Sequence, residues 1–176
     1  AKAMAGKRSL SAMSGDLATD NDANRLEAAG IPSQSITTGS ACHLDAKMVH
    51  EGLHKLPWRE TDLLFIENVG NLVCPAVYDL GQAVNVVALA VTEGEDKPLK
   101  YPVMFRTADL VLLTKVDLLP HLPQINVAAI EDGLARTMPN PEVIHVSAIT
   151  GEGIDRWIEW LEAKRTGALA EVAAEA

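Results

Sequence analysis

Three stretches of the chain are almost continuously apolar, and polar or glycine-containing segments separate them. Continuous apolar runs, in contrast to alternating ones, are typical of strands that are buried on both faces of a parallel sheet. We therefore expect interior strands at Asp62–Ile66, Ala83–Val91 and Leu110–Lys115.

Shorter segments complete an alternation of strands and helices. Further strands are expected at Arg8–Met13, Ser33–Thr37 and Glu142–Ser147. Composition and apolar spacing predict helices at Asp20–Ala29, Leu44–Leu56, Pro98–Ala108 (interrupted by Pro102), Val127–Met138 and Ile154–Lys164. This alternation is typical of an α/β fold with a parallel sheet and right-handed crossovers. The tail, residues 166–176, is expected to fray.

Composition narrows the class of protein. The 176 residues are 48% hydrophobic and 22% charged, which is typical of one globular domain. The net charge of −9 argues against a nucleic-acid partner. The apolar runs are too short to span a membrane, and no signal peptide opens the sequence. Two cysteines cannot form a disulfide scaffold, so we expect a reducing, cytoplasmic location.

The most specific motif follows the third apolar run. Thr114-Lys115-Val116-Asp117 has the form [NT]-K-x-D. An aspartate there can accept hydrogen bonds from N1–H and the exocyclic amine of guanine, a donor pair that adenine lacks. Ser147 and Ala148 follow the next strand, where their backbone can contact the same base. A charged strand terminus is the alternative for either motif alone, but together they favour guanine recognition.

A second group of residues has the chemistry of a metal site. Cys42 and His43 precede a predicted helix, and Cys74 follows the next strand along the chain. The carboxyl ends of neighbouring parallel strands share one edge, so these side chains can converge. Two thiolates and an imidazole suit zinc or nickel, and a two-fold dimer could complete the shell. Spacing alone, however, favours two buried cysteines and a surface histidine.

Other polar residues allow a structural or a functional interpretation. His50 and His54 are four residues apart on a predicted helix and could bind a metal, although such a pair more often lies on a solvated face. Asp16 ends a strand and is the better candidate for holding magnesium or orienting water. Asp20 or Asp22 suits a helix cap.

Six segments together closely resemble the HypB family, the GTPases that help to insert nickel into [NiFe] hydrogenase. They are GDLATDNDA, TGSACHLDAKMVH, LLFIENVGNLVCP, VTEGEDKPLKYP, TKVDLLP and VSAITGEG. The urease accessory family UreG is the nearest alternative. Its pattern places a proline between the cysteine and the histidine and has no counterpart of Cys74, so the resemblance to HypB is stronger.

The resemblance implies a three-layer P-loop NTPase-like G domain over residues 1–165. It implies a homodimer when GTP is bound and a nickel or zinc site at the dimer interface. The metal ligands correspond to Cys42, His43 and Cys74, and the base-recognition residues to Thr114, Lys115, Asp117, Ser147 and Ala148. Asp16 matches a switch aspartate near Mg²⁺ and the attacking water. Glu67 and Gly70 match the segment that senses the γ-phosphate.

The resemblance also implies partners, namely nickel-delivery and hydrogenase-maturation proteins and the hydrogenase large subunit. One family feature is missing, because no G-x-x-x-x-G-K-[ST] phosphate-binding loop occurs in these 176 residues. The chain is expected to begin at the end of the helix that follows this loop. We therefore expect this polypeptide alone to bind GTP poorly and not to hydrolyse it. A metal-binding or dimerisation module without catalysis remains an alternative.

Overall fold

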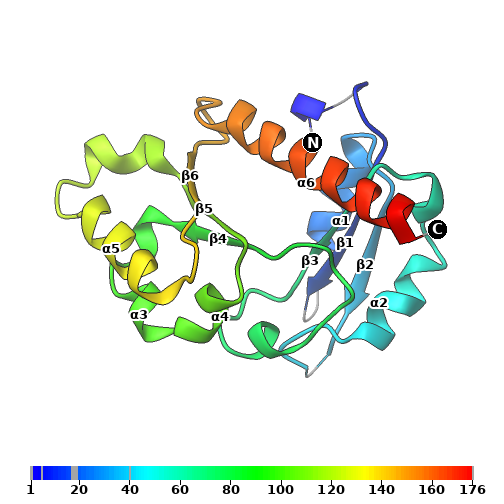
Figure 1. Ribbon diagram of the computed structural model, residues 1–176, viewed down its shortest axis with the longest axis horizontal. Coiled ribbons are helices and arrows are strands. Elements are labelled where there is room, and N and C mark those ends of the chain that lie inside the picture. The colour runs from blue at the N-terminus through cyan, green and yellow to red at the C-terminus, as the bar shows by residue number, and fades with distance from the viewer. Residues whose placement is uncertain (1, 5, 17–19, 40, 176) are drawn as a thin grey trace. The chain divides into compact units, whose positions relative to one another are not determined.

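The computed structural model describes residues 2–4, 6–16, 20–39 and 41–175. The chain divides into two compact units, one ending at Gly81 and the other beginning at Gln82. Each unit contains a parallel three-stranded sheet with helices, which confirms the predicted α/β class (Figure 1). In the described residues, no helix is both long enough and apolar enough to cross a membrane.

The first unit carries a sheet in the order β2-β1-β3. In the register, Ser14 of β1 lies opposite Ser35 on one side and Glu67 on the other. The elements are η1 (Lys2–Met4), β1 (Leu10–Asp16), α1 (Asn21–Ala28), β2 (Ser33–Thr37), α2 (Ala46–Leu53), η2 (Trp58–Glu60), β3 (Leu63–Glu67) and η3 (Cys74–Val77).

The core of the first unit forms where the segment around α2 packs on the sheet. Its buried members are Met13, Leu44, Val49 and Leu56. Gly15 of β1 makes this packing close, because a Cβ atom there would lie 2.7 Å from Cγ of Leu44. The absence of a side chain at Gly15 therefore lets Leu44, two residues before α2, lie directly on the strand.

The second unit carries a sheet in the order β4-β5-β6. Its core gathers around Phe105, Leu113 and Leu134, all fully buried. The elements are β4 (Val86–Ala90), η4 (Val91–Glu93), α3 (Lys97–Lys100), α4 (Pro102–Arg106), β5 (Leu110–Thr114), η5 (Val116–His121), α5 (Val127–Thr137), β6 (Val143–Val146) and α6 (Ile154–Glu175).

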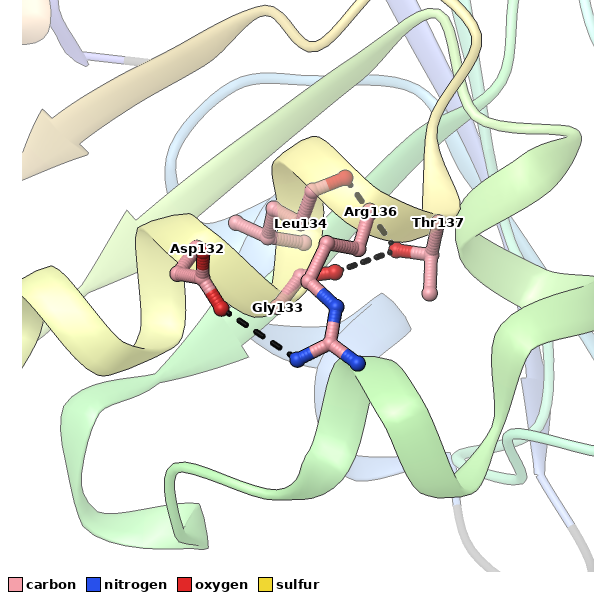
Figure 2. Close-up of polar contacts among 5 residues, drawn as sticks. All are labelled: Asp132, Gly133, Leu134, Arg136 and Thr137. Atoms are coloured by element: carbon pink, nitrogen blue, oxygen red, sulfur yellow. Dashed lines mark hydrogen bonds and ion pairs between the residues drawn. The ribbon is translucent and has the colours of Figure 1, made fainter.

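The end of α5 shows how the chain turns from that helix towards β6. Figure 2 shows the Thr137 hydroxyl pointing back along the helix, where it donates to the carbonyl oxygens of Gly133 (2.9 Å) and Leu134 (3.2 Å). Arg136 pairs with Asp132 at 3.4 Å, one turn earlier. All three contacts lie within α5 and stabilise its last turns. α5 is the helix that connects β5 to β6.

Several predicted boundaries need correction. The strand at Asp62–Ile66 is not buried on both faces, because β3 is the edge of its sheet and Phe65 is 36% exposed. In the second unit β4 is likewise an edge strand, and Ala88 on it is exposed. The first strand continues beyond the expected end at Met13 to Asp16, because Gly15 and Asp16 pair with β2.

The helix boundaries differ in a similar way. The predicted helix at Leu44–Leu56 is shorter, since Asp45 caps it at the amino end and His54 ends it. The helix expected at Pro98–Ala108 is divided into α3 and α4 at Tyr101, just before Pro102, as the proline predicted. The last helix continues to Glu175, well beyond Lys164, through a segment rich in alanine and glutamate, which are good helix formers.

Candidate metal centre and nucleotide-binding residues

The loop that carries Cys42 and His43 connects β2 to α2. Thr38, which is buried, braces the loop, because its hydroxyl donates to the Ala41 carbonyl at 2.7 Å. At the other end the Asp45 carboxylate accepts the Met48 N–H at 2.8 Å and caps α2. The two candidate ligands therefore lie between two fixed points of the backbone. Ser40 of the predicted loop lies outside the described residues.

Leu44 anchors this loop across the sheet. Its side chain is fully buried against β1 at Gly15. Its backbone N–H donates to Oδ1 of Asn68 at 2.8 Å, and the same oxygen accepts the N–H of Val69 at 2.9 Å. Asn68 directly follows β3. The Cys42–His43 loop is thus held by contacts to the two other strands of its sheet.

The three predicted metal ligands converge. The Sγ atoms of Cys42 and Cys74 and a ring nitrogen of His43 all lie within 4.8 Å of one another, and all three residues are half-buried. Cys74 begins the short helix η3 that follows β3. We expected the ligands to follow neighbouring strands, which is wrong in detail, because β1 lies between β2 and β3. The loop reaches across β1 because Leu44 packs where Gly15 leaves space.

The chemistry of these donors fits a borderline or soft metal ion. Sγ of Cys42 lies 3.8 Å from Nδ1 of His43. The hydrogen bond with Cys42 raises the pKa of the Cys74 thiol, and desolvation and the charge of Cys42 raise it further. Without a metal the Cys74 thiol therefore holds its proton more tightly than an isolated cysteine does. A cation that prefers sulfur and imidazole nitrogen, such as Zn²⁺ or Ni²⁺, would replace that proton.

An aromatic residue that the sequence argument missed lies beside the ligands. The ring of Tyr78 stacks on the His43 imidazole, with centroids 3.8 Å apart and planes at 17°. The stack limits rotation of the imidazole about its own bonds. No spacing rule points to Tyr78, because it follows η3 in a loop and meets His43 only in the folded chain.

The residues predicted to face the nucleotide phosphates lie in the same unit. Glu67 ends β3, and its carboxylate accepts the Ser14 hydroxyl at 3.0 Å. Asp16 ends the adjacent strand β1. Gly70 is exposed and has open space around its Cα. The carboxylates of Asp16 and Glu67 therefore belong to the carboxyl ends of two paired parallel strands, where ligands bind in open α/β sheets.

The guanine-recognition motif occupies the end of β5 in the second unit. Thr114 is the last residue of the strand, and Lys115 follows with φ of 61°, the one non-glycine residue with positive φ in the described chain. The Lys115 carbonyl then accepts the Leu118 N–H at 3.0 Å and starts η5. Non-glycine residues in this conformation are uncommon and gather at functional sites. The turn leaves Lys115 exposed and Asp117 half-buried.

Ser147 organises the loop after β6. It is fully buried, and its hydroxyl oxygen accepts the N–H groups of Ile149 (3.2 Å) and Thr150 (3.1 Å). Ala148, in contrast, is exposed. Thr114 lies opposite Val146 in the parallel ladder, so the segments that follow both strands emerge at the same edge of the sheet. The structure thus brings the two predicted base-binding segments to neighbouring positions.

Comparisons of the sequence and of the structure with known proteins all indicate the same family. The CobW/HypB/UreG nucleotide-binding domain matches residues 3–144. The hydrogenase maturation factor HypB of Azotobacter vinelandii is 55% identical over 159 residues, which cover 90% of this chain and 52% of that protein. The chain therefore spans about half the length of this relative and of the HypB of Escherichia coli, which is 52% identical over 151 residues.

Solved structures agree with this assignment. The crystal structure of HypB from Helicobacter pylori in complex with nickel has a TM-score of 0.89 and 36% identity, and the match covers 95% of this chain and 79% of that one. HypB from Archaeoglobus fulgidus has a TM-score of 0.83 and 37% identity, with 92% and 78% covered. The chain belongs to the HypB group of the CobW/HypB/UreG nucleotide-binding domain family.

Proposed function

We propose that this chain is the nucleotide-binding and metal-binding part of a maturation factor that assists nickel insertion into [NiFe] hydrogenase. The observation that carries the proposal is the convergence of Cys42, His43 and Cys74 within 4.8 Å. The family assignment supports it, since the relatives are hydrogenase maturation factors and one of them was solved with nickel. The nickel is cargo, and zinc is the alternative ion for the same ligands.

The metal step depends on two thiolates and one imidazole. Metal binding displaces the thiol protons, because a thiolate is the species that coordinates. Three protein ligands leave a four-coordinate ion one ligand short. A second copy of the chain, facing the first across a two-fold axis, supplies the missing coordination in the proposed homodimer. The half-buried position of the ligands is compatible with such a shared interface.

In the proposed nucleotide complex, residues of the second unit bind the guanine base. The Asp117 carboxylate accepts the two base donors, the Lys115 stem lies along the purine face, and the backbone at Ser147 and Ala148 contacts the base edge. GTP brings Mg²⁺, for which Asp16 is the proposed carboxylate. Glu67 and Gly70 sense the γ-phosphate. The left-handed turn at Lys115 and the buried Ser147 hydroxyl support this assignment, because both fix loop backbone at a strand end.

Coupling between nucleotide and metal follows from the position of Asn68. This residue lies inside the Glu67–Gly70 segment and accepts the Leu44 N–H, two residues from Cys42. Cys74 lies four residues beyond Gly70. A shift of the segment on nucleotide binding therefore moves both sides of the metal centre. This link fits a factor that holds nickel in one nucleotide state and releases it in another.

We propose GTP hydrolysis and partner binding only for a polypeptide that also includes a phosphate-binding loop. The 176 residues contain no G-x-x-x-x-G-K-[ST] loop, which in P-loop proteins supplies the phosphate cradle and the lysine on the β- and γ-phosphates. We therefore assign GTP hydrolysis to a polypeptide that includes such a loop. The proposed partners are nickel-delivery proteins and the hydrogenase large subunit.

Deletion of the gene tests the cellular role. The proposal expects loss of [NiFe] hydrogenase activity with urease activity retained, and partial recovery when nickel is added to the medium. Loss of urease with normal hydrogenase would overturn it in favour of the urease accessory role. Complementation with a Cys74→Ala variant should fail, whereas a metal-independent module would still complement.

A further inference from the structure

A second pair of metal-ligating side chains lies on α2, outside the centre described above. The Nε2 atoms of His50 and His54 are 3.3 Å apart. The rings meet edge to face, with centroids 4.9 Å apart and planes at 84°. Both residues are exposed, and the opposite face of α2 is buried through Val49 and Gly52. The helix therefore holds two imidazoles together on its solvent side.

The separation of the two nitrogens fits chelation of one ion. If each Nε2 bound a metal at about 2.05 Å, the usual zinc–nitrogen distance, a 3.3 Å separation gives an N–metal–N angle of about 107°. This angle is close to tetrahedral. The present contact between the nitrogens requires one proton between two lone pairs, and a cation would take the place of that proton. Little movement of either ring is needed.

The position on the helix also favours a cation. His50 lies in the last turn of α2 and His54 is its C-cap, where the carbonyl ends of the helix carry partial negative charge. The charged neighbours on this face are Lys47 and Glu51, which pair weakly at 4.0 Å, and both are largely exposed. Among the contacts of the described residues, each Nε2 atom has the other Nε2 as its partner.

We propose that His50 and His54 form a second transition-metal site, for a divalent ion of the zinc type, with water molecules completing the shell. The segment His50-Glu51-Gly52-Leu53-His54 has the form H-E-x-x-H that zinc peptidases use. Among the described residues, however, the only group of three close metal ligands is Cys42, His43 and Cys74. The new site therefore has two protein ligands and binds exchangeable metal; we assign it no peptidase chemistry.

The two sites are separate. His54 lies nine residues from the N-cap Asp45, which is about 13 Å along a helix axis. One ion cannot contact both sets of ligands. The proposal does not depend on the nickel function, because it rests on the geometry of α2 alone. Both histidines are exposed, as the sequence-based expectation of a solvated face predicted, and the proposal adds metal binding to that face.

Zinc titration of a chain without the first site tests the proposal. In a Cys42→Ser/Cys74→Ser variant, isothermal titration with ZnCl₂ should still show one zinc per chain. Adding His54→Gln should weaken this binding by roughly a hundredfold, the lower end of what linking two weak contacts provides. Adding His121→Gln, which removes an exposed histidine elsewhere, is the matched control and should change nothing.

A second measurement makes the outcome independent of stoichiometry. Zinc should shift the ring ¹⁵N resonances of His50 and His54 together in this variant and leave that of His121 unchanged. Absence of zinc binding in the double-cysteine variant would overturn the proposal, as would binding that survives His54→Gln. Circular dichroism verifies that each variant is folded, which the exposure of both histidines leads us to expect.

Discussion

The side-chain oxygen of Asn68 accepts the backbone N–H of Leu44 at 2.8 Å and thereby joins the end of β3 to the loop that carries Cys42 and His43. The two residues are 24 positions apart in the sequence. Asn68 also accepts the N–H of Val69, so one amide oxygen satisfies two backbone donors. This contact gives a hydrogen-bonded path from the proposed phosphate sensor to the loop that carries two of the metal ligands.

Replacing Asn68 by alanine should loosen the metal loop. Loss of the acceptor leaves two backbone donors without their partner, which costs about 1–3 kcal/mol of unfolding free energy. We expect weaker Ni²⁺ binding in a competition assay, by about tenfold, which corresponds to 1.4 kcal/mol. Asn68→Asp keeps an oxygen acceptor and should retain most of the affinity. Equal losses in both variants would show that the acceptor is not what matters.

Replacing Gly15 by alanine should disturb the Cys42–His43 loop through its contact with β1. The new Cβ would lie 2.7 Å from Cγ of the fully buried Leu44, so Leu44 must move. Overpacking of this kind costs about 1–3 kcal/mol. Thermal unfolding and Ni²⁺ affinity should both fall, and a second change, Leu44→Val, should restore part of each. A Gly15→Ala variant with wild-type metal affinity would contradict the proposed packing of the loop on β1.

Replacing Gly153 by alanine tests the geometry of the loop after β6. Gly153 has φ of +70°, and a Cβ there would lie 1.8 Å from the His145 carbonyl oxygen. Strain and the backbone clash should together cost about 3 kcal/mol or more, measured by urea unfolding. Gly167→Ala in α6 is the control, because an added Cβ there has open space. Alanine should raise the free energy of unfolding by up to about 1 kcal/mol, since it favours the helix more than glycine does. Similar destabilisation by both changes would argue against the described backbone.

Replacing Asp117 by asparagine tests base recognition. The change exchanges an acceptor for a donor at the position that faces N1 and the exocyclic group, so preference should shift from guanine towards xanthine. The measurement is the ratio of GTP to XTP affinity in a polypeptide that includes a phosphate-binding loop. An unchanged ratio would remove Asp117 from the base site.

The sequence predicted part of this picture well, for physical reasons. The bounds of β2 and the division of the helix before Pro102 follow from local pattern and backbone chemistry. Cys42, His43 and Cys74 were assigned through the resemblance to HypB, since spacing alone favoured ordinary cysteines, and the structure brings the three side chains together. Tyr78 and the role of Asn68 were not found, since stacking on His43 and bonding to Leu44 depend on tertiary contacts that no period encodes. We did not predict that Phe65 lies on an exposed edge strand, because an apolar run does not show which strands lie beside it in the sheet.

The most direct test of the account is the ligand shell of the bound metal. X-ray absorption at the nickel or zinc edge, on the purified chain loaded with one equivalent, should show two sulfur ligands and at least one imidazole nitrogen. In Cys74→Ala one sulfur should disappear and affinity should fall by more than the roughly 10- to 100-fold that loss of an outer-shell partner costs. A shell of nitrogen and oxygen alone, or an unchanged spectrum in Cys74→Ala, would contradict the proposed centre at Cys42, His43 and Cys74.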